Sequence, residues 1–313
     1  MKIKKLITML LCIVMCLGLV ACGDKDSDKE DESSKDKNTK FNKAQELLAD
    51  TYNKEKDINF TCDVTFSMVI GTDLSDIYDG GDGEPSWMDV KSSSEYIAKT
   101  DGKITYTSGT VTSDSLGFEL EEEIEQYTDL SDPKVIKIYE LVDSDKGLWT
   151  VTETKNSLNT SSIVGDKSFV DKLKNAKVIE ENDSQYTIEA DMNFGDLQNI
   201  TGELTDGTKE SYYKGITAKV VITIDKNSNK ISFFKCDMTE AMSNMLKNMS
   251  SSQGLGMRTT ECIIEMKFRD YGTTDKIEIP KEVFDNLTDK DDINIDFNLE
   301  DLEDLEFDFS NFQ

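Results

Sequence analysis

Apolar and polar residues alternate along much of the chain, most clearly in residues 60–70. Every second position of this run is apolar, and the positions between them are mostly polar. A period of two places one set of side chains on a single face of a half-buried antiparallel strand. We therefore expect a strand here whose core-facing residues are Phe60, Cys62, Val64, Phe66, Met68 and Ile70.

Further runs of this kind bring the expected total to about ten strands. Residues 95–99 and 103–111 are joined by the turn dipeptide Asp101-Gly102, and residues 225–229 join another pair at 216–224 and 231–238. A short closing strand is expected at 276–279, because the missing N–H of the following Pro280 suits a strand end. The other expected strands are 135–142, 148–152, 178–180, 185–192 and 260–268.

Helical spacing of apolar residues interrupts the strands in three places. The first begins at Phe41 and continues with Ala44, Leu48 and Tyr52, and the second is a short helix at 166–175. A third helical patch follows residue 238. These elements predict a mainly β (α+β) protein, in which an antiparallel meander surrounds a few short helices.

The first 22 residues have the pattern of an export signal. Three lysines among the first five residues precede an uncharged apolar run of 15 residues, Leu6–Val20, which is too short for a permanent membrane-spanning helix. The sequence Leu19-Val20-Ala21-Cys22-Gly23 resembles the lipobox of bacterial lipoproteins. The resemblance implies cleavage before Cys22, a diacylglycerol on its thiol, and anchoring at the extracytoplasmic face of a cell membrane.

Composition changes along the chain and predicts four regions. After the signal peptide (1–21), residues 22–40 combine the lipidation site with a charged linker that is too polar to fold. Residues 41–285 are long enough for one large β domain. The final region, 286–313, includes nine acids and no base from Asp291 onward, interleaved with apolar residues. It is either a docked segment that covers the core or an acidic-hydrophobic peptide that binds a partner.

Charge and histidine content exclude several functions. The formal net charge is −28, so a nucleic-acid phosphate backbone would be repelled. Histidine is absent, which excludes every mechanism that needs an imidazole as base or metal ligand. No phosphate-binding or dinucleotide fingerprint is present. We expect a protein that is not an enzyme and needs no cofactor apart from the covalent lipid at Cys22.

A family resemblance rests on motifs in the last third of the chain. Residues 220–231 end a strand in Ile-Asp-Lys, turn and start the next strand, and 236–242, 268–271 and 277–283 complete the set. Together they resemble uncharacterised bacterial lipoproteins with a fold like the LolA/LppX lipoprotein-carrier superfamily. The resemblance implies a curved antiparallel sheet that forms an open half-barrel, with short helices covering its concave face over an apolar chamber.

Methionines at helical spacing are candidates for the lining of such a chamber. Flexible methionine side chains suit an adaptable cover over apolar ligands, although ordinary helix packing explains the same spacing. The residues concerned are Met238, Met242, Met245 and Met249.

Cysteines and a cluster of acids are the remaining candidates. Cys62 and Cys262 are in phase with apolar strand faces and are expected to be buried thiols, while a disulfide between Cys236 and Cys262 stays conceivable. The absence of any C-x-x-C spacing argues against zinc and against redox catalysis. Calcium binding by a loop rich in acids is weakly supported, because the ligand spacing of an EF-hand is missing. That loop contains Asp73, Asp76, Asp79, Asp82 and Glu84.

These observations predict a membrane-anchored binding protein for a lipid or an acylated ligand. The alternative is a cell-surface interaction or scaffold module that uses its acidic C-terminal segment. The sequence indicates no nucleic-acid partner and does not identify a protein partner.

Overall fold

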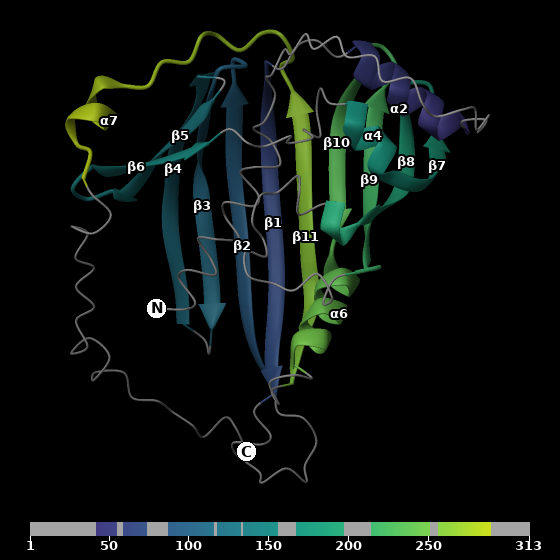
Figure 1. The fold of residues 1–313 in the computed structure, drawn as a ribbon, viewed down its shortest axis with the longest axis horizontal. Coiled ribbons are helices and arrows are strands. Elements are labelled where there is room, and N and C mark those ends of the chain that lie inside the picture. The colour runs from purple at the N-terminus through teal and green to yellow at the C-terminus, as the bar shows by residue number, and fades with distance from the viewer. Residues whose placement is uncertain are drawn as a thin grey trace, which may run out of the picture.

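One antiparallel sheet of eleven strands dominates the structure (Figure 1). The computed structural model describes residues 42–54, 59–73, 87–115, 118–132, 134–155, 167–196, 214–250 and 256–288. The strands are β1 (Phe60–Asp73), β2 (Trp87–Thr100), β3 (Ile104–Ser115), β4 (Phe118–Asp132), β5 (Val135–Asp143), β6 (Leu148–Lys155), β7 (Leu173–Glu181), β8 (Gln185–Asn193), β9 (Thr217–Asp225), β10 (Lys230–Asp237) and β11 (Met257–Arg269).

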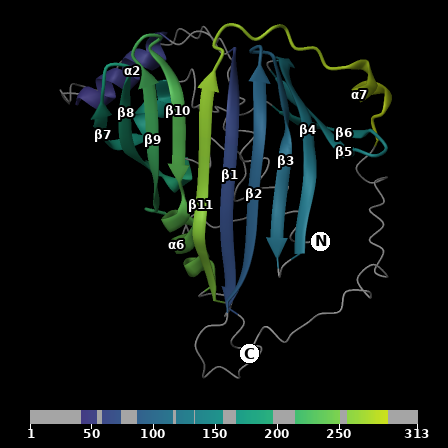
Figure 2. The same ribbon diagram turned by 180° about the vertical axis from the view of Figure 1, so that it is seen from behind.

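The sheet consists of two meanders joined at its centre. Its strand order is β6-β5-β4-β3-β2-β1-β11-β10-β9-β8-β7, so every two adjacent strands of the sheet are consecutive in the chain except β1 and β11. That junction runs from Thr61 opposite Arg269 to Thr72 opposite Met257. The sheet is open, and the strands at both ends turn away from the central ones (Figures 1 and 2). The expectation of a mainly β fold with a curved antiparallel sheet is confirmed.

The alternation in β1 explains the two faces of the sheet. Phe60, Cys62, Val64, Phe66 and Met68 are all buried. We call the face that carries them the inner face and the opposite one the outer face. The expected core positions of β1 are thus confirmed, and Ile70 is partly buried against the same cluster.

In the described ranges, three helices pack on the inner face, and they lie on the half of the sheet formed by β7–β11. They are α2 (Lys43–Lys54), α4 (Lys167–Lys172) and α6 (Thr239–Ser250). Leu48 of α2, Phe169 of α4 and Ala241 of α6 join the main core. Each large side chain buried in this way contributes about 1.5–3 kcal/mol relative to exposure. No helix in the described ranges is both long and apolar enough to cross a lipid bilayer.

A strap of residues 274–288 crosses to the other half of the sheet and contains the short helix α7 (Lys281–Asp285). Asn59 Nδ2 donates a hydrogen bond of 2.7 Å to the Thr274 carbonyl. At the far end, the Trp149 N–H donates to the Asn286 carbonyl at 3.0 Å. Between these ends, Val283 packs on an outer-face cluster that contains Tyr127, Tyr139 and Trp149.

The strap overturns the prediction of a closing strand at 276–279, because these residues form no strand. Both edges of β11 are already occupied, by β1 and β10, so the segment has no place in the central sheet. Instead, the Ile277 N–H donates to Asp101 Oδ2 at 2.9 Å, and Ile277 and Ile279 pack on the outer-face cluster. Apolar alternation here reflects docking rather than strand pairing.

The strands differ most from expectation at three places. The whole of β4 was missed, because Glu122 lies between the inner-face residues Leu120 and Ile124, and the apolar side chain of Tyr127 lies on the outer face. The strand expected at 95–99 extends over β2, and the strand expected at 178–180 extends over β7, which begins directly after α4. In β2 and β7, pairing with the neighbouring strands continues beyond the residues whose composition favours a strand.

Candidate functional site: the inner face of the sheet

The inner face changes character between β1 and β2. On β1 and β11 it is apolar, with Phe66 opposite Ile264 and Met68 opposite Cys262. Across the other edge of β1, the same Phe66 is opposite Ser94 and Met68 is opposite Ser92. A border between apolar and hydroxyl-bearing side chains therefore lies between β1 and β2 at Phe66 and Met68. Nearer the start of β1 the face stays apolar across both strands, because Ala98 and Tyr96 of β2 belong to the main core.

Small polar side chains cover the inner face of β2–β4 and are nevertheless buried. Gln126 Nε2 donates to Thr128 Oγ1 at 2.9 Å, whereas Ser94 Oγ and Thr105 Oγ1 have no hydrogen-bond partner among the residues that the structure describes. A buried polar group left unsatisfied costs about 1–3 kcal/mol, so this surface favours a polar group or water against it. We call this surface the hydroxyl patch, and it consists of Ser92, Ser94, Thr100, Thr105, Thr107, Ser113, Gln126 and Thr128.

Apolar residues lie within and beside the hydroxyl patch. Val111 and Ile124 are buried on the same face, and Val111 is opposite Ser94. The contacts of α2, α4 and α6 go mainly to β7, β9 and β11, so these helices cover the apolar half of the face. The arrangement offers an apolar wall next to hydrogen-bonding groups, which is the usual lining of a site for an amphipathic small molecule.

The predicted methionine stripe lies on the apolar half of the inner face. Met238 precedes α6, and its N–H donates to the Cys262 carbonyl at 2.8 Å. Met242 and Met245 of α6 are buried in the main core at 7% exposure each. Met249 is in the last turn of α6, and its side chain lies outside the described residues.

All three cysteines of the described chain are free thiols. Cys62, Cys236 and Cys262 are buried on the inner face. Burial raises the pKa of the Cys262 thiol to about 12, and it raises the pKa of Cys62 and of Cys236 as well. Such thiols are protonated at neutral pH and chemically inert. The prediction of buried thiols for Cys62 and Cys262 is confirmed.

Several predicted features lie outside the described residues. These include Cys22 with its lipobox, most of the acidic loop (Asp76, Asp79, Asp82 and Glu84), and the acidic segment from residue 291. Asp73 is described at the end of β1, where its N–H donates to the Gly256 carbonyl at 2.9 Å. In the described ranges, no three acidic or cysteine side chains lie close enough together to hold a metal ion.

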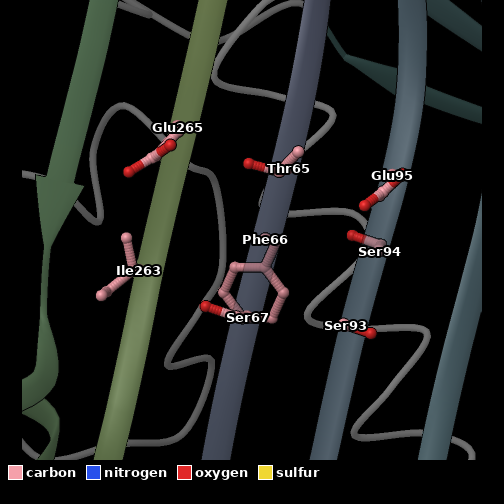
Figure 3. Close-up of a pocket in the computed structure, with 8 residues that line it drawn as sticks. All are labelled: Thr65, Phe66, Ser67, Ser93, Ser94, Glu95, Ile263 and Glu265. Carbon is pink, nitrogen blue, oxygen red and sulfur yellow. The ribbon is translucent and has the colours of Figure 1, made fainter.

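An open depression of about 270 Å³ lies on the outer face where β1, β2 and β11 meet (Figure 3). Glu265, Thr65 and Glu95 form one cross-strand row through it, and Ile263, Ser67 and Ser93 form the next. Glu265 is held by Lys235, whose Nζ is 2.8 Å away. The floor is made of short side chains and has no nucleophile paired with a base, so it resembles an ordinary sheet surface.

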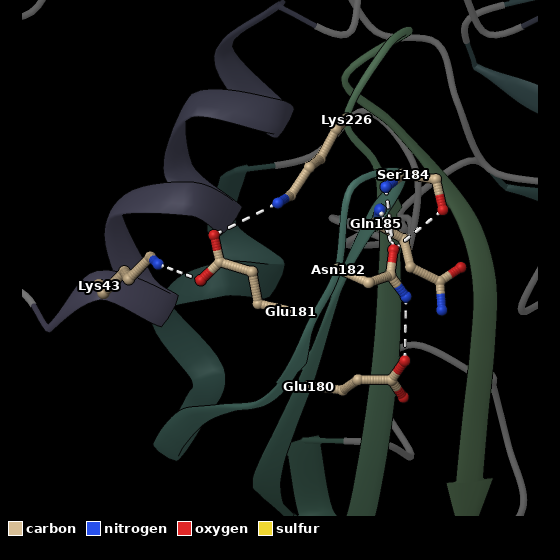
Figure 4. Close-up of polar contacts among 7 residues, drawn as sticks. All are labelled: Lys43, Glu180, Glu181, Asn182, Ser184, Gln185 and Lys226. Atoms are coloured by element: carbon tan, nitrogen blue, oxygen red, sulfur yellow. Dashed lines mark hydrogen bonds and ion pairs between the residues drawn. The ribbon is translucent and has the colours of Figure 1, made fainter.

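A charged cluster ties α2 to the sheet near the β7–β8 hairpin (Figure 4). Glu181 accepts hydrogen bonds from Lys43 at 2.5 Å and from Lys226 at 3.3 Å. These bonds lower the pKa of Glu181. Lys226 also lies over the Tyr186 ring, 4.2 Å from its centroid. Each lysine has an acidic partner here, and the cluster is a structural clasp rather than a ligand site.

Sequence reasoning missed the hydroxyl patch. Serine and threonine occupy alternate positions of β2 and β3, and from their polarity alone these positions are expected to face solvent. Only the register of the strands shows that they share a face with Phe66 and Met68. The one available signal was Tyr96 and Ala98, which are in phase with Ser92 and Ser94.

Comparison with known proteins adds no family to this picture. No protein-family model and no curated protein matches the chain.

Proposed function

We propose that this chain is an extracytoplasmic lipoprotein, anchored to a cell membrane through Cys22, that holds an apolar or acylated ligand on the inner face of its sheet. The anchor rests on the order of basic start, apolar run and cysteine in the first 22 residues. Two or three acyl chains bind a membrane stably, whereas one binds marginally.

The border along the inner face carries the ligand part of the proposal. An acylated molecule has an apolar chain and a polar head, and it needs both kinds of surface side by side. Phe66 and Met68 offer the apolar surface. The hydroxyl patch offers the polar surface on the neighbouring strand, about 4.8 Å away. The binding role needs no catalytic group, so the proposed protein is not an enzyme.

The anchor is tested by palmitate labelling in the native host. Wild-type chain should incorporate labelled palmitate and sediment with membranes. The Cys22→Ala variant should do neither, because the thiol that carries the diacylglycerol is gone. Recovery of unlabelled wild-type protein from the culture medium would refute the anchor while leaving the ligand proposal open.

The ligand site is tested by native mass spectrometry of protein purified without detergent. We expect the wild type to carry a copurified lipid or acylated molecule, and the Ser94→Phe variant to lack it because the new ring fills space beside Phe66. Ser93→Phe is the matched control, since Ser93 is the next residue of β2 and faces outward. Circular dichroism checks that both variants fold.

Equal ligand occupancy in both serine variants would contradict the site on the inner face. Wild-type protein that is ligand-free, and that also fails to bind added fatty acids, would contradict the binding function itself.

The alternative function, a surface interaction module, is favoured by apolar residues at the end of the strap. Phe284 and Leu287 are 47% and 40% exposed, directly before the acidic C-terminal segment. Deletion of residues 291–313 separates the two functions. Loss of a copurifying partner with an intact fold supports the module, whereas unfolding supports a docked segment that belongs to the core.

A further inference from the structure

The first half of β4 forms a free edge of the sheet. On one side, β4 pairs with β3 continuously from Phe118 to Asp129. On its other side it pairs with β5 only from Gln126 onward. Within the part of the chain that the structure describes, residues 118–124 therefore have no strand along their second side, and Figure 1 shows this part of β4 projecting beyond β5.

The backbone groups that point out of this edge belong to glutamates. The Leu130 N–H donates to the Lys103 carbonyl at 2.7 Å, on the β3 side. Because N–H and C=O groups alternate sides along an antiparallel strand, even-numbered residues of β4 face β3 and odd-numbered residues face the edge. The edge-directed residues of the free half are Glu119, Glu121 and Glu123, whereas Glu125 already faces β5 next to the pair of Gln126 and Glu140.

The two faces of the edge differ in chemistry. The four glutamate side chains lie on the outer face, and the first three are exposed, while Glu125 accepts a hydrogen bond of 3.2 Å from Tyr106 OH. On the inner face, Leu120 is 60% exposed, and the exposed Glu122 separates it from the buried Ile124. A strand added here would meet carboxylates on the outer face, and an exposed leucine next to one further carboxylate on the inner face.

We propose that this edge binds an extended basic segment of a partner protein, which adds as a further strand to the sheet. The main chain of the segment would pair with the three edge-directed glutamates, as in β-strand addition. Its lysines or arginines would alternate with apolar residues, so that the basic side chains lie opposite carboxylates and the apolar ones cover Leu120.

Charge selects this occupant over the two nearest competitors. A second copy that paired through the same edge would place glutamates opposite glutamates. The chain's own alternating segment, residues 293–309, carries only acids among its charged residues. Like charges directly opposite each other destabilise a strand pair, and the net charge of −28 adds long-range repulsion.

The test uses the full chain and a capped nonapeptide of alternating lysine and valine. Residue-resolved hydrogen exchange should show fast exchange at the amides of Glu119, Glu121 and Glu123 in the free protein, and slowing of at least tenfold when the peptide binds. The amides of Leu120 and Glu122 face β3 and should be protected throughout. Slow exchange at all three glutamate amides of the free protein would overturn the proposal, because the edge would already be occupied.

Glu121→Pro removes one edge-directed N–H without touching the pairing to β3, and proline is tolerated on an edge strand. It should weaken peptide binding at least tenfold. Glu121→Ala removes only the charge and should weaken binding about threefold. Exchange protection of β1 amides reports whether the proline variant is folded. Equal affinity of the proline and alanine variants would overturn pairing through the main chain.

Charge selection is tested with two double variants. The edge variant combines Glu121→Lys with Glu123→Lys, and the control variant combines Glu180→Lys with Glu282→Lys, which changes the net charge equally at exposed sites on β7 and α7. Peptide affinity should fall at least tenfold in the edge variant and change less than threefold in the control variant. Similar losses in both variants, or tight binding of a glutamate-valine peptide, would overturn the proposal. A dimer of the free protein that dissociates in Glu121→Pro would also overturn it, because a second copy would be the occupant.

Discussion

Gly109 lies in the middle of β3, on the inner face opposite Tyr96. A Cβ atom placed on it would come within 2.1 Å of the Glu95 carbonyl oxygen and 2.4 Å of Tyr96 Cβ. Glycine normally weakens a strand, because it loses more backbone entropy on folding than alanine does. At this position the close approach of β2 reverses that preference.

We therefore predict that Gly109→Ala destabilises the protein by about 2–3 kcal/mol, as an overpacked core position does. Urea unfolding followed by circular dichroism measures the change. Thr110→Ala, at the next residue on the outer face, is the control and should cost less than about 1 kcal/mol. A Gly109→Ala variant as stable as the wild type would show that β2 moves aside without cost.

At the scale of elements, the junction of β1 and β11 holds the two meanders together. On its outer face, Arg269 donates from Nε to Asp63 Oδ2 at 3.0 Å and from Nη2 to Asp63 Oδ1 at 2.8 Å. The hydrogen bonds from this guanidinium lower the pKa of Asp63 below its ordinary value of 3.8. Two-point contact gives the pair a defined geometry.

The lowered pKa predicts how Asp63→Asn depends on pH. The charged pair stabilises the fold at pH values above the ordinary pKa, and this stabilisation is lost as the pH falls through the lowered one. Because the pair is partly exposed, we expect a loss of only about 0.5–1 kcal/mol at pH 7. The difference from wild type should shrink steadily below pH of about 4.

Urea unfolding at a series of pH values measures this difference. Asp183→Asn, in the turn before β8, controls for the general loss of one negative charge. A difference between Asp63→Asn and wild type that is constant down to about pH 2 would contradict the ionic origin.

At the scale of the whole molecule, the two meanders of the described sheet pair strand to strand at one place, the junction of β1 and β11. The strands β6 and β7 are consecutive in the chain but lie at opposite ends of the sheet. The fold therefore depends on pairing between residues near 65 and residues near 265, which are far apart in sequence. Pairing at such separation is slow, because loop closure precedes any stabilising contact.

This topology predicts that a cut between β6 and β7 leaves the protein assembled. We propose to place a protease site within residues 156–166 and to cleave the folded protein. The two fragments should coelute at about 1 μM, because the junction of β1 and β11 buries apolar side chains of both, and the strap and α2 each pack on the other fragment. Separation should require a denaturant. Fragments that separate on dilution in buffer would contradict the junction as the main connection.

Local patterns were sufficient for much of the sheet. The alternation at 60–70 located β1 and its buried residues, and the turn residues 225–229 located the β9–β10 hairpin. These features depend on residues adjacent in sequence, so periodicity reveals them. The same phase correctly placed the thiols of Cys62 and Cys262 inside.

The candidate site could not be predicted from the sequence, because it depends on which residues of neighbouring strands lie opposite each other. No local sequence pattern specifies this register. Ser94 belongs to the inner face because it pairs with Phe66. The free edge of β4 follows from where β5 stops pairing.

What the sequence determined by itself is therefore most of the strands, the faces that most of them bury, and the net charge of −28 that limits the choice of partner. Only the tertiary structure decided that β1 pairs with β11, that residues 276–279 dock on the outer face, and that hydroxyls gather beside Phe66. The physical reason is that periodicity records which side of a strand is buried, whereas the choice of neighbour depends on contacts between distant segments.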